Sequence, residues 1–288
     1  MNHTLNEIQI EKIRKLAEEQ RRKLGFGSDA PIANDLFTIL DNMKIRLLQY
    51  PIEFDGENSA FSAALMYSTE GDEELVFIGL NTADYFDKQV FAIAHELYHY
   101  LTKTATHVSR LSEEKYSLLE IEANRFAAEF LLPKSTLESI ILNEFKTSNL
   151  HQLQNKTLLR FIARLHCTWW LPYHSLVKRL KEIDAISLQQ YNKLYSVQAR
   201  DLEGEFASIG KAINKEVFIK LNRATNQIGT SPEEIEIIIR NFEDNIIDED
   251  KFDQILKIFD KTPAEFGYKI EVPSEDITEF EDFFNRGG

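Results

Sequence analysis

The sequence predicts an α+β fold in which helices dominate. Two observations support this class: short apolar runs outline three strands between residues 44 and 80, and from residue 84 onward apolar residues recur at helical spacing. The 288 residues include 43% hydrophobic and 28% charged side chains, which supplies enough apolar material for real cores and excludes wholesale disorder. We therefore expect a small sheet among helices, in two domains.

The first eighty residues are expected to hold two helices and the sheet. Residues 6–24 show helical apolar spacing that ends at a cluster of glycine and proline, and residues 32–43 follow as a second helix. The last two of the three strands are joined by a turn at residues 69–72. We expect these strands at residues 44–50, 60–67 and 74–80, in a small antiparallel sheet.

The rest of the chain is expected to be helical, because its apolar residues recur every three or four positions. We expect helices near residues 84–104, 112–132, 135–145, 150–163 and 171–183. Further amphipathic helices are expected beyond residue 187, including residues 233–242 and 252–259.

The charge is unevenly distributed along the chain. The formal net charge of −14 argues against general nucleic-acid binding, which needs clustered Lys and Arg. Residues 231–288 carry 17 acidic and 6 basic side chains, whereas residues 145–200 carry nine basic and two acidic ones. We interpret both regions as solvated helix faces. A contact between the two regions, and DNA binding through the basic one, are the alternatives.

Cysteine usage and hydropathy point to the cytoplasm. The single cysteine, Cys167, has no partner for an internal disulfide, and no apolar run such as residues 75–80 is long enough to span a membrane. No signal-peptide pattern is evident either. Cys167 lies beside two tryptophans, so we expect a buried thiol and no nucleophile.

The chemistry is concentrated in the motif H-E-x-x-H, formed by His95, Glu96 and His99 within the helix expected at 84–104. Residues four apart lie on one helix face, so the two imidazoles can bind a single ion. A carboxylate at Glu96 would lie beside that ion, where it can take a proton from water and later deliver it to a departing amine. This spacing is typical of zinc-assisted peptide hydrolysis.

A catalytic zinc site needs a third protein ligand, and the next helix offers two glutamates. Glu120 shares its helix face with small and polar residues that allow close approach to a neighbouring helix. Glu122 shares its face with Arg125, which predicts a solvated charge ladder. We therefore assign the third ligand to Glu120, and we expect Asn124, one turn later, to contact a ligating histidine.

Together these residues resemble the ImmA/IrrE family of metallopeptidases. The H-E-x-x-H motif and residues 120–133, which fit E-x-x-A-N-x-F-A-x-x-x-L-L-P, resemble the two signatures of this family. The resemblance implies a thermolysin-like, gluzincin-type core over residues 1–185, with one Zn²⁺ bound by His95, His99 and Glu120 and with Glu96 as general base. A helical, acidic domain with a regulatory or recognition role would then occupy residues 186–288.

The resemblance also implies a substrate class. Members of this family usually cleave a helix-turn-helix repressor, which releases silenced genes of a mobile element or a stress response. We therefore expect a zinc-dependent endopeptidase that acts on a specific protein partner. The alternative is a non-proteolytic regulator that binds and sequesters a repressor.

Several segments allow more than one interpretation. Tyr98 replaces a glycine that is usual in the family, and it is expected to shield the metal, to stabilise the oxyanion or to pack against the sheet. The strand at 75–80 is either a substrate-binding edge or an ordinary central strand. Residues 145–185 can form a helix-turn-helix-like shape, and the acidic, aromatic segment 274–288 is expected to dock on a partner, cover the cleft or pack as a last helix.

Overall fold

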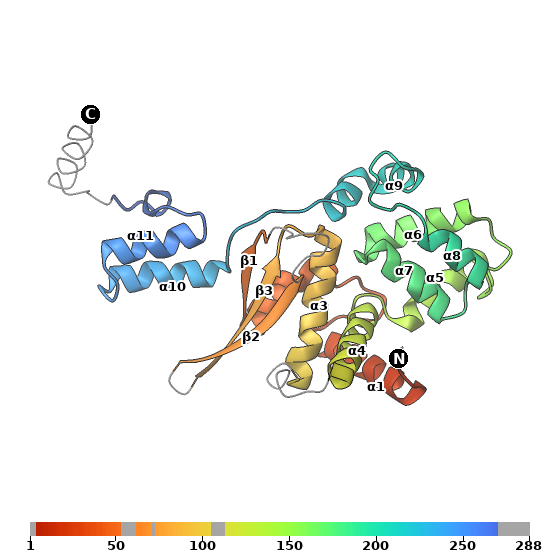
Figure 1. Cartoon of the computed structure of the whole chain (residues 1–288), viewed down its shortest axis with the longest axis horizontal. Helices are drawn as coiled ribbons and strands as arrows, with labels where there is room; N and C mark the ends of the chain where they lie inside the picture. Colours follow the sequence, from red (N-terminus) through yellow and green to blue (C-terminus); the bar gives the residue numbers. More distant parts are fainter. Residues whose placement is uncertain (1–3, 53–61, 71–72, 105–112, 270–288) are drawn as a thin grey trace. The chain divides into compact units, whose positions relative to one another are not determined.

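The computed structural model describes residues 4–52, 62–70, 73–104 and 113–269, and the chain divides into two compact units, residues 1–227 and 228–288 (Figure 1). The boundary expected between residues 185 and 186 lies inside the first unit. The two helices that follow this boundary, at residues 188–195 and 205–221, pack on the helices at residues 155–169 and 173–182.

The first unit contains three strands and nine α-helices among its described residues. Its strands are β1 (Ile45–Tyr50), β2 (Ala63–Glu70) and β3 (Glu73–Asn81). Its helices are α1 (Glu7–Lys23), α2 (Leu36–Asn42), α3 (Phe86–Thr102), α4 (Glu113–Leu131), α5 (Lys134–Phe145), α6 (Asn155–Trp169), α7 (Tyr173–Glu182), α8 (Leu188–Tyr195) and α9 (Glu205–Leu221).

The sheet is mixed, so the expectation of an antiparallel sheet is wrong for one of its two strand pairs. The strand order is β1-β3-β2, and β2 pairs with β3 in antiparallel register while β1 pairs with β3 in parallel register. β1 and β2 lie at opposite edges of the sheet. β3 lies between them and runs antiparallel to β2 and parallel to β1. Residues 75–80 thus form a central strand, and β2 is an edge strand. The tip of the turn expected at 69–72 lies outside the described residues.

Helix α3 is the central helix of the first unit and lies between the sheet and α4 (Figure 1). It begins after Tyr85, and most of its side chains are buried, including Val90 and Leu97. It ends at Lys103, whose left-handed backbone (φ 56°) turns the chain back toward the last helical turn. An apolar helix of this kind fixes the position of any polar side chain that it carries.

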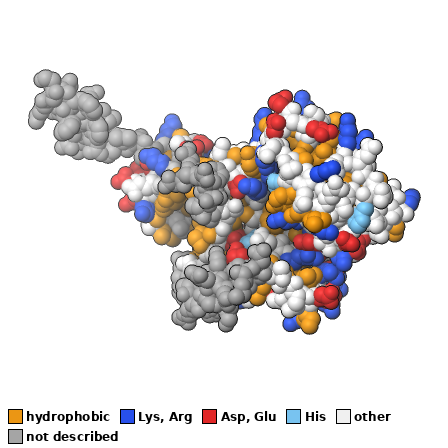
Figure 2. All heavy atoms as spheres, turned by 45° about the vertical axis from the view of Figure 1, so that its right-hand side comes forward, with side chains coloured by type: hydrophobic (Ala, Val, Ile, Leu, Met, Phe, Trp, Pro, Cys, Tyr) orange, Lys and Arg blue, Asp and Glu red, His pale blue; other side chains and the backbone are white. Residues whose placement is uncertain are grey.

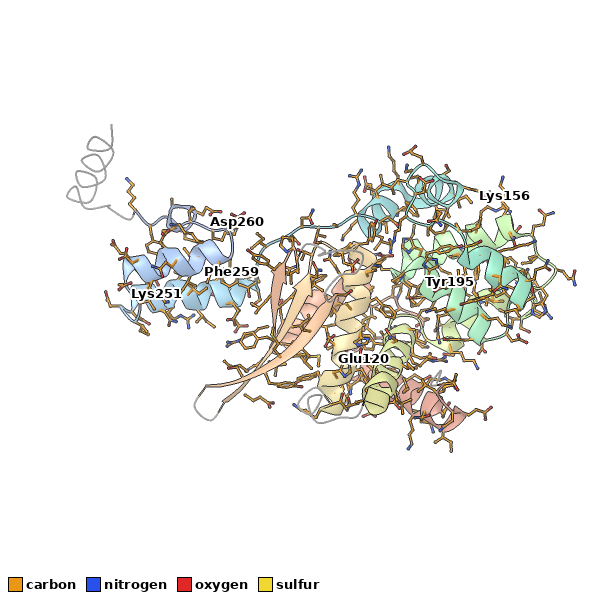
Figure 3. All side chains as sticks on the ribbon, viewed as in Figure 1. Glu120, Lys156, Tyr195, Lys251, Phe259 and Asp260 are labelled. Carbon is orange, nitrogen blue, oxygen red and sulfur yellow. The ribbon has the colours of Figure 1, made fainter. Side chains whose placement is uncertain are left out.

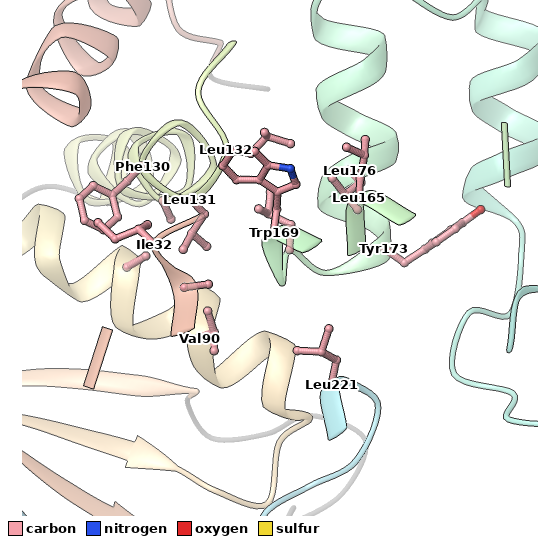
Figure 4. Close-up of a cluster of buried hydrophobic side chains, with 14 of the residues drawn as sticks. Ile32, Val90, Phe130, Leu131, Leu132, Leu165, Trp169, Tyr173, Leu176 and Leu221 are labelled. Carbon is pink, nitrogen blue, oxygen red and sulfur yellow. The ribbon is translucent and has the colours of Figure 1, made fainter. Parts of the chain in front are cut away.

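A single apolar core connects this helix to the helices that follow. Figure 4 shows Val90 of α3 beside Leu131 of α4, with Trp169 of α6, Leu176 of α7 and Leu221 of α9 in the same cluster. All five side chains are buried. The later helices are therefore held in place against the helices that carry the H-E-x-x-H motif and Glu120.

The second unit contains α10 (Pro232–Glu243), α11 (Glu249–Ile258) and a short 3₁₀ turn at Pro263–Phe266. An aromatic cluster forms its core: the rings of Phe242 and Phe252 stack with centroids 4.3 Å apart, and Tyr268 packs on both. These helices match the two expected at 233–242 and 252–259. The segment 274–288 lies outside the described residues. No described helix of the chain is both long and apolar enough to cross a membrane.

A buried ion pair ties α4 to α7. Arg179 donates to both carboxylate oxygens of Glu129 at 2.8 and 2.9 Å, and both side chains are 1% exposed. Arg125 and the backbone N–H of Lys134 also donate to Glu129. Burial by itself would raise the pKa of Glu129, but the two guanidinium groups outweigh it and hold this pKa below its ordinary value of 4.5.

We expect Glu129→Gln to destabilise the fold by about 3–5 kcal/mol, because it leaves the buried Arg179 with only the exposed Glu182, 3.4 Å away, as counter-charge. Chemical denaturation at pH 7 measures this loss. The matched control is Glu138→Gln, which removes an exposed pairing with Lys134 and is expected to cost at most about 1 kcal/mol. Equal losses in the two variants would contradict the account.

The same ion pair predicts a pH dependence. Because the folded-state pKa of Glu129 is lowered, its stabilisation is present above the pKa of the unfolded chain and is lost as the pH falls through the lowered folded value. The stability difference between wild type and Glu129→Gln should therefore shrink in acid.

Candidate metal centre

Helices α3 and α4 bring three candidate metal ligands together. His95 and His99 lie one turn apart on α3, and Glu120 of α4 contacts both imidazoles. Figure 3 labels Glu120 where α4 lies beside α3. The two Nε2 atoms are 3.2 Å apart, and the carboxylate oxygens of Glu120 lie 3.2 Å from Nε2 of His95 and 3.4 Å from Nε2 of His99. These three residues are the cluster of candidate ligand atoms that the described part of the chain contains.

The donor set fits a zinc ion. Ligand atoms at the usual Zn–N and Zn–O distances of about 2.0–2.1 Å in a tetrahedron are separated by roughly 3.3 Å, which is close to the separation of the two Nε2 atoms. Each Nε2 atom also has one oxygen of Glu120 at a similar distance. Hydrogen bonds from His95 and His99 lower the pKa of Glu120 to about 2, so this carboxylate is ionised and ready to bind a cation. Two neutral imidazoles and one carboxylate leave a fourth position open for water or substrate.

Hydrogen bonds on the far side of each imidazole set its orientation. Nδ1 of His95 lies 3.2 Å from Oδ1 of Asn124, as expected from the sequence. Nδ1 of His99 lies 3.0 Å from the hydroxyl of Thr104, which in turn contacts Thr102, whose hydroxyl donates to the carbonyl of Tyr98. Because Asn124 Oδ1 accepts only, the proton of a neutral His95 ring lies on Nδ1, which leaves the lone pair of its Nε2 free to bind a metal ion. The hydroxyl of Thr104 can accept from Nδ1 of His99 in the same way.

Thr104, which lies just beyond the end of α3, was not predicted from the sequence. The position of Thr104 is set by Lys103, whose left-handed backbone reverses the chain. The backbone N–H of Thr104 therefore donates to the carbonyl of His99. The hydroxyl of Thr104 is thereby placed next to the imidazole of the same residue.

Glu96 lies beside the cluster and is mostly buried. Its Oε2 accepts a hydrogen bond from the backbone N–H of Leu65 on β2 at 3.0 Å. Burial raises the pKa of Glu96, and the neighbouring histidines only partly offset this effect. A carboxylate with a raised pKa is suited to accept a proton and to release it again.

The site opens into a pocket of about 770 Å³ between α3, α4 and the start of α7. Its lining includes His95, Glu96 and Glu120 on one side. The other side was not identified from the sequence and consists mainly of cationic and aromatic residues. It includes Tyr85, Lys88, Tyr173, His174 and Arg200.

Arg200 is held firmly on that second side. It donates to both carboxylate oxygens of Asp87, at 2.8 and 2.9 Å, and to Asn222 at 2.7 Å, and its guanidinium lies 4.1 Å from the ring centroid of Tyr85. Asp87 belongs to the first turn of α3. This contact therefore fastens the segment before α9 to the helix that carries the histidines.

Tyr98 takes neither of the expected roles at the metal. Its ring is buried against Phe126 of α4, with centroids 5.6 Å apart, and its hydroxyl donates to Glu122 at 2.8 Å. Glu122 also accepts from Gln9 of α1, so the ladder expected with Arg125 is absent among the described contacts of Glu122. Tyr98 thus packs between helices, and its hydroxyl is already used.

Two neighbouring residues of α6, His166 and Cys167, have structural environments. His166 is fully buried, with Nδ1 2.6 Å from the carbonyl of Leu171 and Nε2 3.0 Å from Asn222. Burial raises the pKa of Cys167 to about 11, as expected for an inert thiol.

Four of the nine basic side chains in region 145–200 form ion pairs. Arg164 pairs with Glu144, Arg179 with Glu129, Lys181 with Asp184, and Arg200 with Asp87. Figure 2 shows Lys and Arg side chains interspersed with apolar and acidic ones on the face in view.

The fold and the site define a metallopeptidase-type domain. Residues 58–166 match the family model of the IrrE N-terminal-like domain of the M78 peptidases, and this segment contains the H-E-x-x-H motif and Glu120. The segment that carries the site therefore belongs to the ImmA/IrrE family. No curated protein and no solved structure matches the chain.

We expect purified wild-type protein to hold close to one zinc ion per chain and Glu120→Ala to lose it, because the carboxylate completes the ligand set. Elemental analysis after gel filtration measures the metal content. Glu122→Ala is the matched control: it should keep the metal and lose about 1–3 kcal/mol of stability, because the buried hydroxyl of Tyr98 loses its acceptor. Metal loss in both variants or in neither would contradict the assignment.

Thr104→Val should lower zinc affinity about 10- to 100-fold, because the imidazole of His99 loses its oriented hydrogen bond. Competition with a chromogenic chelator measures the affinity. Thr147→Val, at an exposed threonine outside the site, serves as the control. Unchanged affinity in Thr104→Val would show that this contact does not orient the ligand.

Proposed function

We propose that this protein is a zinc-dependent endopeptidase that hydrolyses a peptide bond in a specific protein substrate. One observation carries the proposal: two imidazoles and a carboxylate bring their ligand atoms within 4.8 Å of one another, with the carboxylate of Glu96 in the same pocket. A purely structural metal site would be closed by a fourth protein ligand and would not need a neighbouring general base.

The chain's own residues divide the work of hydrolysis. When bound, a zinc ion supplies Lewis-acid polarisation and activates water for attack. Glu96 accepts the proton of the attacking water and then delivers it to the departing amine. The N–H of Leu65 holds Oε2 of Glu96 in place, while Asn124 and Thr104 hold the two imidazoles.

We place the extended substrate along β2, since residues 75–80 form the central strand. The carbonyl of Ser62 accepts from Asn81, whereas the N–H of Leu65 points away from β3 toward Glu96. Backbone groups alternate in an antiparallel pair, so Ala63, Leu65 and Tyr67 direct theirs to the open edge. This edge lies next to Glu96 and offers backbone pairing to a peptide.

The substrate that we propose is a helix-turn-helix transcriptional repressor in the cytoplasm, whose cleavage releases genes of a mobile element or a stress response. The support for it is the family resemblance together with the endopeptidase-type site. A regulator that only sequesters its repressor is the competing function, and the geometry of Glu96 favours cleavage over it.

Glu96→Gln should keep one zinc ion per chain and bind its partner normally, but lower cleavage by about 10²–10⁴-fold, because the amide cannot accept the proton. The assay incubates zinc-loaded protein with the repressor encoded beside it and detects fragments by mass spectrometry. If the variant relieves repression as well as the wild type does, the protein acts by sequestration.

A further inference from the structure

A second hollow adjoins the metal-site pocket. It has a volume of about 570 Å³ and shares Phe91, Asn124 and Ser175 with that pocket, so the two form one continuous groove across α3, α4 and α7. Asn124 is also the residue that contacts His95. A chain bound at the metal centre would therefore extend directly into the second hollow.

The walls of the second hollow are mainly apolar. Leu5, just before α1, and Ile10 of α1 line it together with Ile121 and Ala128 of α4, and Phe91 lies where it adjoins the metal-site pocket. Walls and volume of this kind suit a large aliphatic or aromatic side chain.

The second hollow also contains one uncompensated cation. Arg125 and Arg179 both pair with Glu129 and Glu182. Glu182 lies one turn after Lys178 on α7 but is engaged by these arginines at 2.8 and 3.4 Å. Among the described residues that line the hollow, Lys178 is thus the cation with no carboxylate within ion-pair distance; its ammonium has only the ring of Tyr195 nearby, 5.9 Å from the centroid.

We propose that the second hollow is a substrate subsite that takes a large apolar side chain, and that Lys178 selects a carboxylate next to that side chain in the substrate. The inference rests on the proposed function, because it assigns specificity to the same groove. The occupant is a peptide because the hollow adjoins the metal centre. The apolar walls select a large apolar side chain of that peptide. The ammonium of Lys178 selects an acidic residue next to it.

Binding and cleavage of defined peptides test the subsite. The probes are fluorescein-labelled dodecapeptides of Gly, Ala and Ser that contain one Phe, with Glu, Gln or Lys before or after it. Fluorescence anisotropy measures their binding to zinc-loaded Glu96→Gln protein, and mass spectrometry measures their cleavage by the wild type. We expect Glu-flanked peptides to bind about three- to fivefold more tightly than Gln-flanked ones, and replacement of Phe by Ala to weaken binding about tenfold or more.

Lys178→Glu, added to Glu96→Gln, should reverse the preference toward Lys-flanked peptides. Lys193→Glu makes the same charge change at an exposed position on α8 outside the hollow and should leave the preference unchanged.

The subsite is overturned if no peptide binds, if the preference survives Lys178→Glu, or if both variants shift it equally. Cleavage without preference for acidic peptides also overturns the subsite while leaving the peptidase intact. Lys178-dependent binding with no cleavage of peptide or protein would instead remove the peptidase and keep the subsite.

Discussion

The packing of α4 against α3 is the constraint on which the rest of the structure depends. One helix carries both imidazoles and the other carries the carboxylate, so the site exists only if the two helices meet in one register. The fully buried Ala123 and Ala127 allow α4 to approach closely, and the ring contact between Phe126 and Tyr98 sets its position along α3. A shift of one residue would replace Glu120 by an apolar side chain.

Three glutamates of α4 have three different roles, which their partners determine. Glu120 faces two imidazoles, Glu122 accepts from Tyr98 and Gln9, and Glu129 binds two arginines. Glu122 and Glu129 bind α4 to α1, α3 and α7. Their ion pairs and hydrogen bonds help to hold α4 in the position from which Glu120 contacts the imidazoles. The contact with α7 also brings His174 and Lys178 to the groove.

The sequence predicted the parts of this arrangement that depend on local spacing. The four-residue interval of the histidines placed both on one face of α3, and the small residues around Glu120 distinguished it from Glu122. Contacts between distant segments were not predictable in this way. The parallel pairing of β1 depends on a crossing of the chain, Thr104 depends on the backbone of Lys103, and the attachment of α8 and α9 to the first unit depends on tertiary packing.

The most direct test of the central claim is the zinc-edge X-ray absorption spectrum of the zinc-loaded protein. The account predicts that only nitrogen and oxygen atoms coordinate the zinc ion, at about 2.0–2.1 Å. The outer-shell scattering should show two imidazole rings in the wild type and one in His99→Ala. A sulfur shell at about 2.3 Å, which would implicate Cys167, or a spectrum that His99→Ala leaves unchanged, would contradict a centre built from α3 and α4.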